Sequence, residues 1–210
     1  MIKKISQYIA ALIGKELQND KSKIDIYSYA LEIIIGTILK LTLIILISFI
    51  LGLLPTTLAC LISFIIFRHF GGGVHLSTYN RCLTAGVITF LIMGKLAYIN
   101  IQINVLITIV IGTFLFGIYS IMKYIPAGTK KKRIIDKNQR LKRKQETFFM
   151  LFIWLIVIVI LINYKLTAYA FSCVLGALNS FFFITPTGYW VFDTIDNIID
   201  KNKRRWMKNV

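Results

Sequence analysis

The sequence predicts an all-α integral membrane protein with about six hydrophobic segments and an amphipathic N-terminal helix. Hydrophobic residues make up 57% of the 210 residues, and the mean hydropathy is +0.71. The chain also carries 25 Lys and Arg against 9 Asp and Glu. This charge bias is typical of membrane proteins whose basic loops face an anionic cytoplasmic leaflet. Nucleic-acid binding is not expected, because long uncharged spans separate the basic residues.

The N-terminal segment, residues 1–28, is predicted to form an amphipathic helix in the membrane interface. Ile5, Ile9 and Leu12 recur at helical spacing, whereas Lys15 lies on the opposite face. A helix with one apolar and one charged face lies along a bilayer surface rather than across it.

The hydrophobic segments that follow differ in length. A spanning helix needs about 20 apolar residues. The segments that reach this length are 31–54, 103–122, 147–164 and 168–185, whereas 56–67 and 83–99 are expected to be short or tilted. The chain is accordingly divided into an interfacial segment (1–28), hydrophobic segments with a polar loop (29–122), a basic loop (123–146), a transmembrane hairpin (147–188) and an amphipathic basic tail (189–210).

The distribution of basic residues predicts the orientation in the membrane. Residues 123–144 contain ten Lys and Arg and a single acid, Asp136, and residues 201–208 contain five basic residues. The positive-inside rule places such segments in the cytoplasm. Counting the hydrophobic segments backwards then places the N-terminus and the polar stretch 68–82 on the cytoplasmic side as well.

The polar stretch "RHFGGGVHLSTYNRC", residues 68–82, interrupts the hydrophobic sequence with both histidines and a cysteine. Its three consecutive glycines are poor helix formers and permit positive φ, so a helix is expected to end there. Ser77 or Thr78 is expected to cap the next helix. His75 would then lie on a loop and Cys82 in the first turns of a helix, so that the loop can fold back and bring imidazole and thiol together.

This placement favours nucleophilic chemistry at Cys82. The positive end of a helix, with Arg81 alongside, stabilises a thiolate, and an adjacent imidazole can take up the proton. A Cys/His dyad is the simpler interpretation, because the only carboxylates between Arg68 and Thr147 are Asp136 and Glu146. An amide such as that of Asn80, or a backbone carbonyl, is expected to orient the imidazole.

Other interpretations of the same residues stay open. His75 can be an interfacial polar residue and Cys82 an inert packed thiol. A metal site formed by His69, His75 and Cys82 lacks a fourth ligand and any typical ligand spacing. No metal or other cofactor is therefore expected.

The pattern R-x-x-x-G-G-x-H-x-x-x-x-x-x-C, formed by Arg68, Gly72, Gly73, His75 and Cys82, resembles the AgrB (accessory gene regulator B) family of bacterial membrane peptidases. The segment "YIPAGTKKKR", residues 124–133, is similar to the Pro-Ala and lysine cluster of that family. The chain departs from many members at Arg133, where a proline is expected, which affects the loop geometry and not the proposed chemistry.

The resemblance implies a membrane-embedded cysteine endopeptidase in which His75 and Cys82 are catalytic. Its substrate would be an AgrD-type quorum-sensing propeptide, which the enzyme cleaves and cyclises to a thiolactone or lactone. The resemblance further implies supporting roles for Arg68, Gly72 and Gly73, and a homodimer. Lys130, Lys131 and Lys132 either bind an acidic propeptide tail or serve as a solvated loop near anionic lipid.

Two alternatives of other classes are a small membrane peptide transporter and a noncatalytic membrane adaptor. The number of hydrophobic segments and the lysines within them favour a transporter. The absence of a clear inverted repeat, and the gathering of polar residues at one edge, argue against it.

Overall fold

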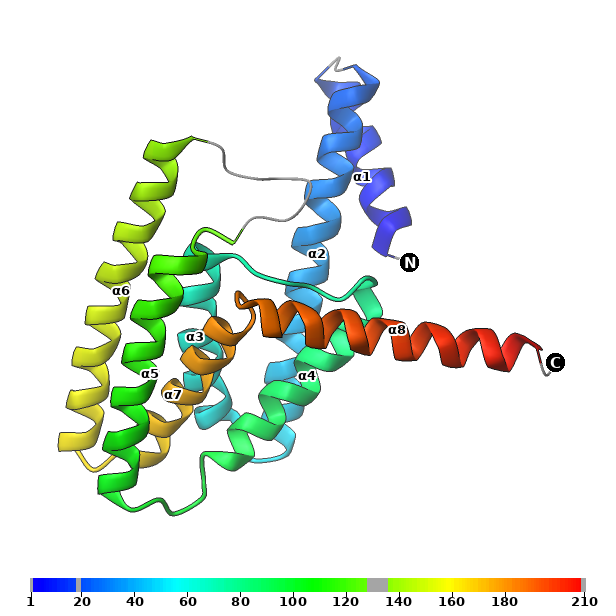
Figure 1. Cartoon of the computed structure of the whole chain (residues 1–210). Helices are drawn as coiled ribbons and strands as arrows, with labels where there is room; N and C mark the ends of the chain where they lie inside the picture. The colour runs from blue at the N-terminus through cyan, green and yellow to red at the C-terminus, as the bar shows by residue number, and fades with distance from the viewer. Residues whose placement is uncertain (1, 18–19, 128–135, 209–210) are drawn as a thin grey trace. The chain divides into compact units, whose positions relative to one another are not determined.

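The computed structural model describes residues 2–17, 20–127 and 136–208, with side chains up to Lys201 (Figure 1). The regular secondary structure of these residues is entirely α-helical, which confirms the predicted fold class. The helices are α1 (Ile2–Glu16), α2 (Lys21–Ile50), α3 (Leu54–Gly71), α4 (Tyr79–Leu96), α5 (Ile103–Tyr124), α6 (Lys137–Asn163), α7 (Thr167–Phe182) and α8 (Pro186–Lys208).

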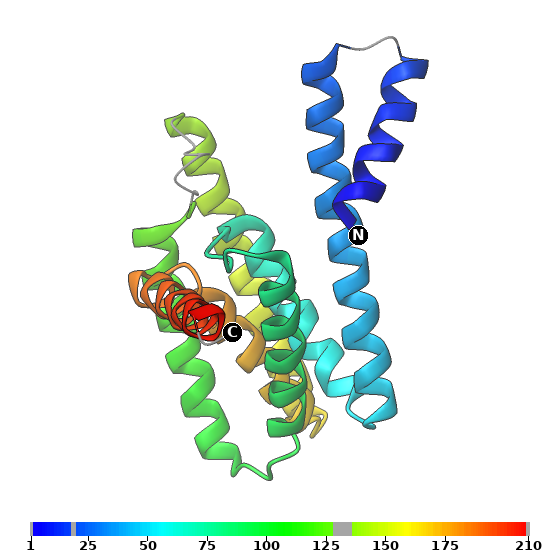
Figure 2. The ribbon, with the colours of Figure 1, turned by 90° about the vertical axis from the view of Figure 1, so that its right-hand side faces the viewer.

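The chain forms two compact units, residues 1–47 and 48–210. In the first unit, the predicted amphipathic helix is present as α1, which runs alongside the first part of α2 (Figure 2). Ser6, Ala10 and Gly14 are buried at intervals of four residues. A Cβ atom on Gly14 would lie only 2.6 Å from Cδ1 of Ile24. Small residues on one face of α1 therefore allow the two helices to approach closely.

Four helices are long and apolar enough to cross a membrane, namely α2, α3, α5 and α6. A fifth span is possible if α7 and α8, bent by 82° at the break between them, are counted together. The chain is thus a multi-pass membrane protein. Segment 56–67, which was expected to be short, is long enough to span because α3 continues to Gly71. Segment 168–185, which was expected to span, is too short by itself because α7 has only 16 residues.

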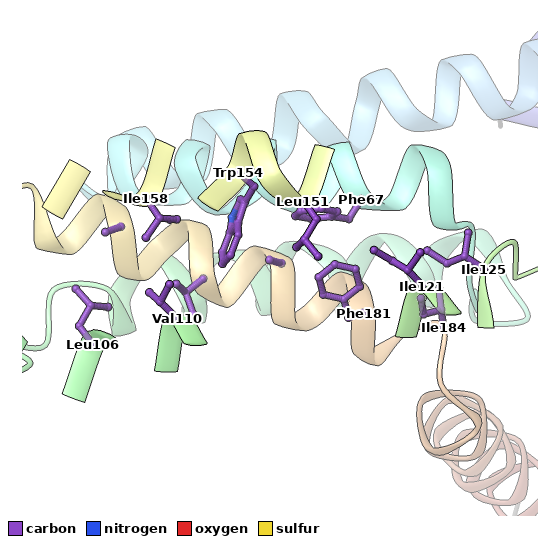
Figure 3. Close-up of a cluster of buried hydrophobic side chains, with 13 residues drawn as sticks. Phe67, Leu106, Val110, Ile121, Ile125, Leu151, Trp154, Ile158, Phe181 and Ile184 are labelled. Atoms are coloured by element: carbon purple, nitrogen blue, oxygen red, sulfur yellow. The ribbon is translucent and has the colours of Figure 1, made fainter. Parts of the chain in front are cut away.

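The core of the second unit surrounds α7, which packs against α3, α5 and α6 (Figure 3). A Cβ atom on Gly176 of α7 would collide with the carbonyl oxygen of Cys60 on α3, so the two backbones touch. The Ser63 hydroxyl donates to the Cys173 carbonyl oxygen at 2.7 Å and accepts from Trp154 Nε1 at 3.1 Å. Small residues and buried polar contacts are the usual means of joining helices in membranes, where lipid tails are as apolar as leucine.

The start of α6 differs from the expected basic loop. Asp136 is the N-cap residue, and its Oδ1 atom accepts a hydrogen bond from the backbone nitrogen of Asn138 at 3.0 Å. Such a cap satisfies one of the free N–H groups at a helix start. The region 123–146 is therefore helical from Lys137 onwards, and its basic residues at 137–144 project from a helix.

Candidate functional site

The polar stretch forms a sharp turn after α3. Helix α3 includes Gly71, whereas Gly72 and Gly73 adopt positive φ angles of 74° and 129°, as expected for residues that end the helix. A Cβ atom on Gly72 would lie 2.5 Å from the carbonyl oxygen of Ala127. One on Gly73 would collide with the Arg68 guanidinium and lie 2.8 Å from the Phe183 oxygen. Both positions therefore need glycine for their backbone angles and for the close approach of their neighbours.

Backbone hydrogen bonds fix this turn to two other parts of the chain. The Val74 nitrogen donates to the Phe183 oxygen at 3.0 Å, and the Ala127 nitrogen donates to the Gly71 oxygen at 2.9 Å. Val74 and Leu76 are buried on either side of His75. The loop is therefore held at one end of the helix bundle, between the end of α5 and the turn from α7 to α8 (Figure 1).

The loop brings His75 to Cys82. Nδ1 of His75 lies 3.8 Å from Sγ of Cys82, within contact distance for sulfur. Cys82 is partly accessible in the first turn of α4, where its backbone nitrogen donates to the Thr78 oxygen at 3.1 Å. Thr78 occupies the N-cap position, but its side chain makes no capping hydrogen bond, so the cap expected from a hydroxyl is absent there.

The other two cysteines have different surroundings. Cys60 is buried and its thiol contacts the Met93 sulfur at 3.7 Å, and the Cys173 thiol donates to the Ala59 oxygen at 3.7 Å. Both lie within the helix bundle, as packed hydrophobic thiols do. In the described part of the chain, Cys82 is thus the cysteine that combines partial exposure with an imidazole contact.

Arg68 contacts the His75 ring at Nε2, the ring nitrogen that does not face Cys82. Its Nη2 atom lies 3.0 Å from Nε2 of His75 and donates to the Val74 carbonyl oxygen. The guanidinium carbon also lies 5.7 Å from the Phe183 ring centroid and 6.0 Å from that of Phe64. Because a guanidinium can only donate hydrogen bonds, the Nε2 atom must accept, and the proton of a neutral imidazole then resides on Nδ1, facing Cys82.

Arg81 lies next to Cys82 but is engaged by α8. Its Nη1 atom lies 2.9 Å from Oδ1 of Asp196, and its Nη2 atom bonds to Asp200. The pKa of Asp196 lies below its usual value: partial burial opposes ionisation, but hydrogen bonds from Arg81 and Ser77 outweigh it. The expected stabilisation of a thiolate by Arg81 stays a prediction, and the structure adds two carboxylates that balance the charge of Arg81.

The other residues singled out in the sequence do not contact the His75–Cys82 pair or are not among the residues that the structure describes. Asn80 is exposed, and Arg68 takes the place at the imidazole that was expected for an amide. The ring of His69 packs edge-on against Phe70 at 5.0 Å. Within the described residues, three or more potential metal ligands do not gather at any point. Lys130, Lys131, Lys132 and Arg133 lie outside the described residues.

A pocket of about 340 Å³ opens where the end of α3 meets the start of α6. Its cationic residues belong to the basic region 123–146, and Arg143 is paired with Glu146 at 3.7 Å. The lining residues are His69, Phe70, Gln139, Lys142, Arg143 and Glu146. The pocket therefore places the cations Lys142 and Arg143 in the same lining as His69, which follows Arg68 in the chain.

Asp196 and Asp200 are the residues at this site that sequence reasoning missed. Their spacing of four residues places them on one face of α8, away from Ile195, Ile198 and Ile199. That pattern predicts an acidic helix face. It does not reveal that the partner is Arg81, which is more than a hundred residues away along the chain.

The fold and the site together define a class: a multi-pass, all-helical membrane protein that holds a cysteine–histidine pair at one end of its helix bundle. The family model for Accessory gene regulator B matches residues 6–185. The chain belongs to this family, and the resemblance inferred from the Arg-Gly-Gly-His-Cys pattern is confirmed.

Individual relatives agree with this assignment. The chain is 26% identical to an AgrB-like protein of Clostridium perfringens strain SM101 and 27% identical to AgrB-like protein 2 of strain 13. Each alignment covers 96% of this chain and 99% of the relative. It is also 26% identical to Accessory gene regulator protein B of Staphylococcus aureus strain JH9, over 63% of this chain and 68% of the relative. No solved structure matches the chain.

Proposed function

We propose that the protein is a membrane cysteine endopeptidase that cleaves an AgrD-type propeptide and cyclises it to a thiolactone or lactone. The observation that carries the proposal is the 3.8 Å contact between Nδ1 of His75 and Sγ of Cys82 in a chain of the Accessory gene regulator B family. The contact places a nucleophile next to a general base that can accept its proton, which is the arrangement that covalent catalysis requires.

In the reaction Cys82 acts as the thiolate, which accepts a hydrogen bond from Nδ1–H of His75 across the 3.8 Å contact, with the Arg68 guanidinium at Nε2 of the same ring. The thiolate attacks the scissile carbonyl carbon, and the carbon–nitrogen bond of the substrate breaks. His75 takes up a proton from water at Nε2, where the contact with Arg68 opens, and its Nδ1 proton then passes to the leaving nitrogen, so that the ring becomes neutral with its proton on Nε2. The product of this step is a thioester between Cys82 and the new carboxyl end, and the step consumes one proton.

Ring closure follows by attack of an internal cysteine or serine of the propeptide on the same carbonyl. Its thiol or hydroxyl proton passes to the vacant Nδ1 of His75, Nε2 releases its proton to water, the new thioester or ester bond forms, and the Cys82 thiolate leaves. This step returns the proton that the first step consumed. Thioester exchange is close to isoenergetic, so the ring forms only if the internal nucleophile is held near the carbonyl and water is limited.

The surroundings of the pair suit these demands. Val74 and Leu76 are buried next to His75, and Phe64 and Phe183 flank Arg68. We place this end of the bundle at the cytoplasmic membrane boundary, because the basic region 123–144 begins there. The pocket lined by Lys142 and Arg143, together with lysines 130–132, would bind an acidic propeptide tail. A homodimer is part of the same proposal and rests on the family resemblance.

The test is a reconstitution in nanodiscs with a synthetic cognate propeptide. Wild-type protein should release the C-terminal tail and form the ring, whereas Cys82→Ala and His75→Ala should do neither. Cys173→Ala, which also removes a thiol, should behave as wild type. A propeptide whose internal cysteine is replaced by alanine should accumulate a hydroxylamine-sensitive adduct on Cys82, detected by peptide mass spectrometry.

The outcomes separate the classes of protein. Cleavage by Cys82→Ala at the wild-type rate would refute the peptidase proposal. Transfer of intact propeptide across sealed liposomes without cleavage would establish a transporter, and binding without either reaction would establish an adaptor.

A further inference from the structure

A single carboxylate on α8 holds both ends of the segment that presents the catalytic pair. Asp196 Oδ2 accepts a hydrogen bond from the backbone nitrogen of Ser77 at 2.8 Å, and Oδ1 accepts from Arg81 Nη1 at 2.9 Å. Ser77 follows His75 by two residues, and Arg81 immediately precedes Cys82. The same Nη1 atom donates to the Ser77 hydroxyl at 3.1 Å, which closes the cluster.

We propose that Asp196 is a positioning residue that sets the distance between His75 and Cys82. The inference rests on the proposed function, and it adds a role for α8 that the family pattern of residues 68–82 does not contain. The imidazole lies on a loop and the thiol on a helix, so their separation depends on how the loop joins α4. Since the Thr78 side chain does not cap this helix, the carboxylate of Asp196 fixes the junction instead.

The contact between Asp196 and Arg81 is a hydrogen-bonded ion pair. Hydrogen bonds between ionised partners are shorter and about twice as strong as neutral ones. The side chains of Arg81 and Asp196 are only 15% and 16% exposed, so solvent screens their attraction less than it would on an open surface. Asp200 is 49% exposed and extends the pair as an outer member.

Close contacts at the turn between α7 and α8 fix the position of the α8 carboxylates. The break between α7 and α8 is tight: the Gly188 nitrogen donates to Oγ1 of Thr185 at 3.1 Å, and a Cβ atom on Gly188 would lie 3.1 Å from the Phe182 carbonyl carbon. The rings of Phe183 and Phe192 pack edge to face at 4.7 Å. The Phe183 oxygen also accepts from the Val74 nitrogen, so the turn holds the loop on one side of His75 while Asp196 of α8 holds Ser77 on the other side.

The experiment compares Asp196→Asn with Asp193→Asn in the full-length protein in nanodiscs. Asp193 is exposed on the same helix, and among the described residues it is not one of the carboxylates that contact Arg81. Two quantities are measured: kcat and KM for propeptide cleavage, and the rate of Cys82 alkylation by iodoacetamide at pH 7, mapped by peptide mass spectrometry. Alkylation reports on the thiolate and needs no propeptide.

We expect Asp196→Asn to lower kcat about tenfold, the effect of losing a hydrogen bond to a charged group, with KM little changed. Alkylation of Cys82 should slow in parallel, because the thiolate loses its contact with Nδ1–H of His75. Asp193→Asn should match wild type in both measurements, and Asp196→Glu should recover part of the rate.

Other results would overturn the inference. Wild-type kcat and wild-type alkylation in Asp196→Asn would show that the carboxylate does not position the pair, and equal losses in both Asn variants would show a nonspecific charge effect. Should Asp196→Asn fail to fold, Arg81→Lys gives the same comparison, since it keeps the charge but cannot bridge two carboxylates. If wild type processes no propeptide, the proposed function fails, whereas the alkylation comparison still tests the positioning role.

Discussion

Arg68 and His75 make a contact that determines the tautomer of the imidazole. The Nη2 atom of Arg68 lies 3.0 Å from Nε2 of His75, and the guanidinium has no atom that can accept a hydrogen bond. The neutral ring therefore carries its proton on Nδ1 and directs it at Cys82. Protonation of a leaving amine by the same ring needs a second proton on Nε2, so this contact must open during that step. The contact thus describes the resting ring, with the Arg68 cation at Nε2 and Cys82 at Nδ1.

The first prediction separates the charge of Arg68 from its hydrogen bonds. Arg68→Gln removes the positive charge, whereas Arg68→Lys keeps it. We expect alkylation of Cys82 at pH 7 to be about tenfold slower in the Gln variant than in the Lys variant, because only the Lys variant keeps a cation behind the imidazole that contacts the thiol. Equal rates in the two variants would show that Arg68 acts through geometry alone. The measurement is the time course of Cys82 modification by peptide mass spectrometry.

The second prediction concerns the glycine turn. Gly73→Ala forces a side chain onto a residue with φ of 129° and into the Arg68 guanidinium, at a cost of about 1–3 kcal/mol for the backbone strain alone. We expect a lower unfolding temperature in detergent and loss of propeptide cleavage. The matched control is Gly112→Ala, since a Cβ atom there meets nothing within 4 Å. Unfolding temperatures that fall equally in both variants would contradict the interpretation of the turn.

The sequence predicts the helices and the approach of His75 to Cys82 because both follow from local properties. Apolar length identifies the helices. Consecutive glycines end α3, and the polar residues after them begin α4, so a loop histidine is brought back to a helix-start cysteine. Arg68 was expected to matter only through the family pattern, since no local rule states that its side chain returns across the glycines to Nε2.

The contribution of α8 could not be predicted, for a different reason. Asp196 bonds to Ser77 across 119 positions of sequence. Pairing over such a separation depends on how α7 turns into α8, and the break between them was not visible in the apolar segment 168–185. The charge of Arg81 was accordingly assigned to the thiol, although the fold supplies Asp196 and Asp200 as its partners.

The third prediction tests the basic region beside the pocket. Lys142→Glu places a negative charge where the pocket would bind an acidic peptide tail, so KM for propeptide cleavage should rise with little change in kcat. Lys165→Glu, at the opposite end of α6, serves as the control for a reversed charge. Reversal at 130–132 should have a larger effect in the same direction. Loss of membrane insertion in proportion to the loss of processing, measured by fractionation, would leave only a topological role for these lysines.

The last prediction places α8 in the membrane interface. The bend of 82° between α7 and α8 directs α8 across the axis of α7, and α8 exposes Trp190, Ile195 and Ile198 on the face away from Asp196. An amphipathic helix with an exposed tryptophan belongs at the level of the lipid headgroups.

The measurement is fluorescence quenching by brominated lipids in a Trp206→Phe background. Bromine atoms near the headgroups should quench the Trp190 fluorescence more than bromine atoms at the bilayer centre. Trp190→Phe should abolish that difference, and Trp154→Phe, which removes a buried tryptophan of the core, should retain it. Equal quenching at both depths would mean that α8 does not rest on the bilayer, and its carboxylates would then be held at Arg81 by the turn after α7 alone.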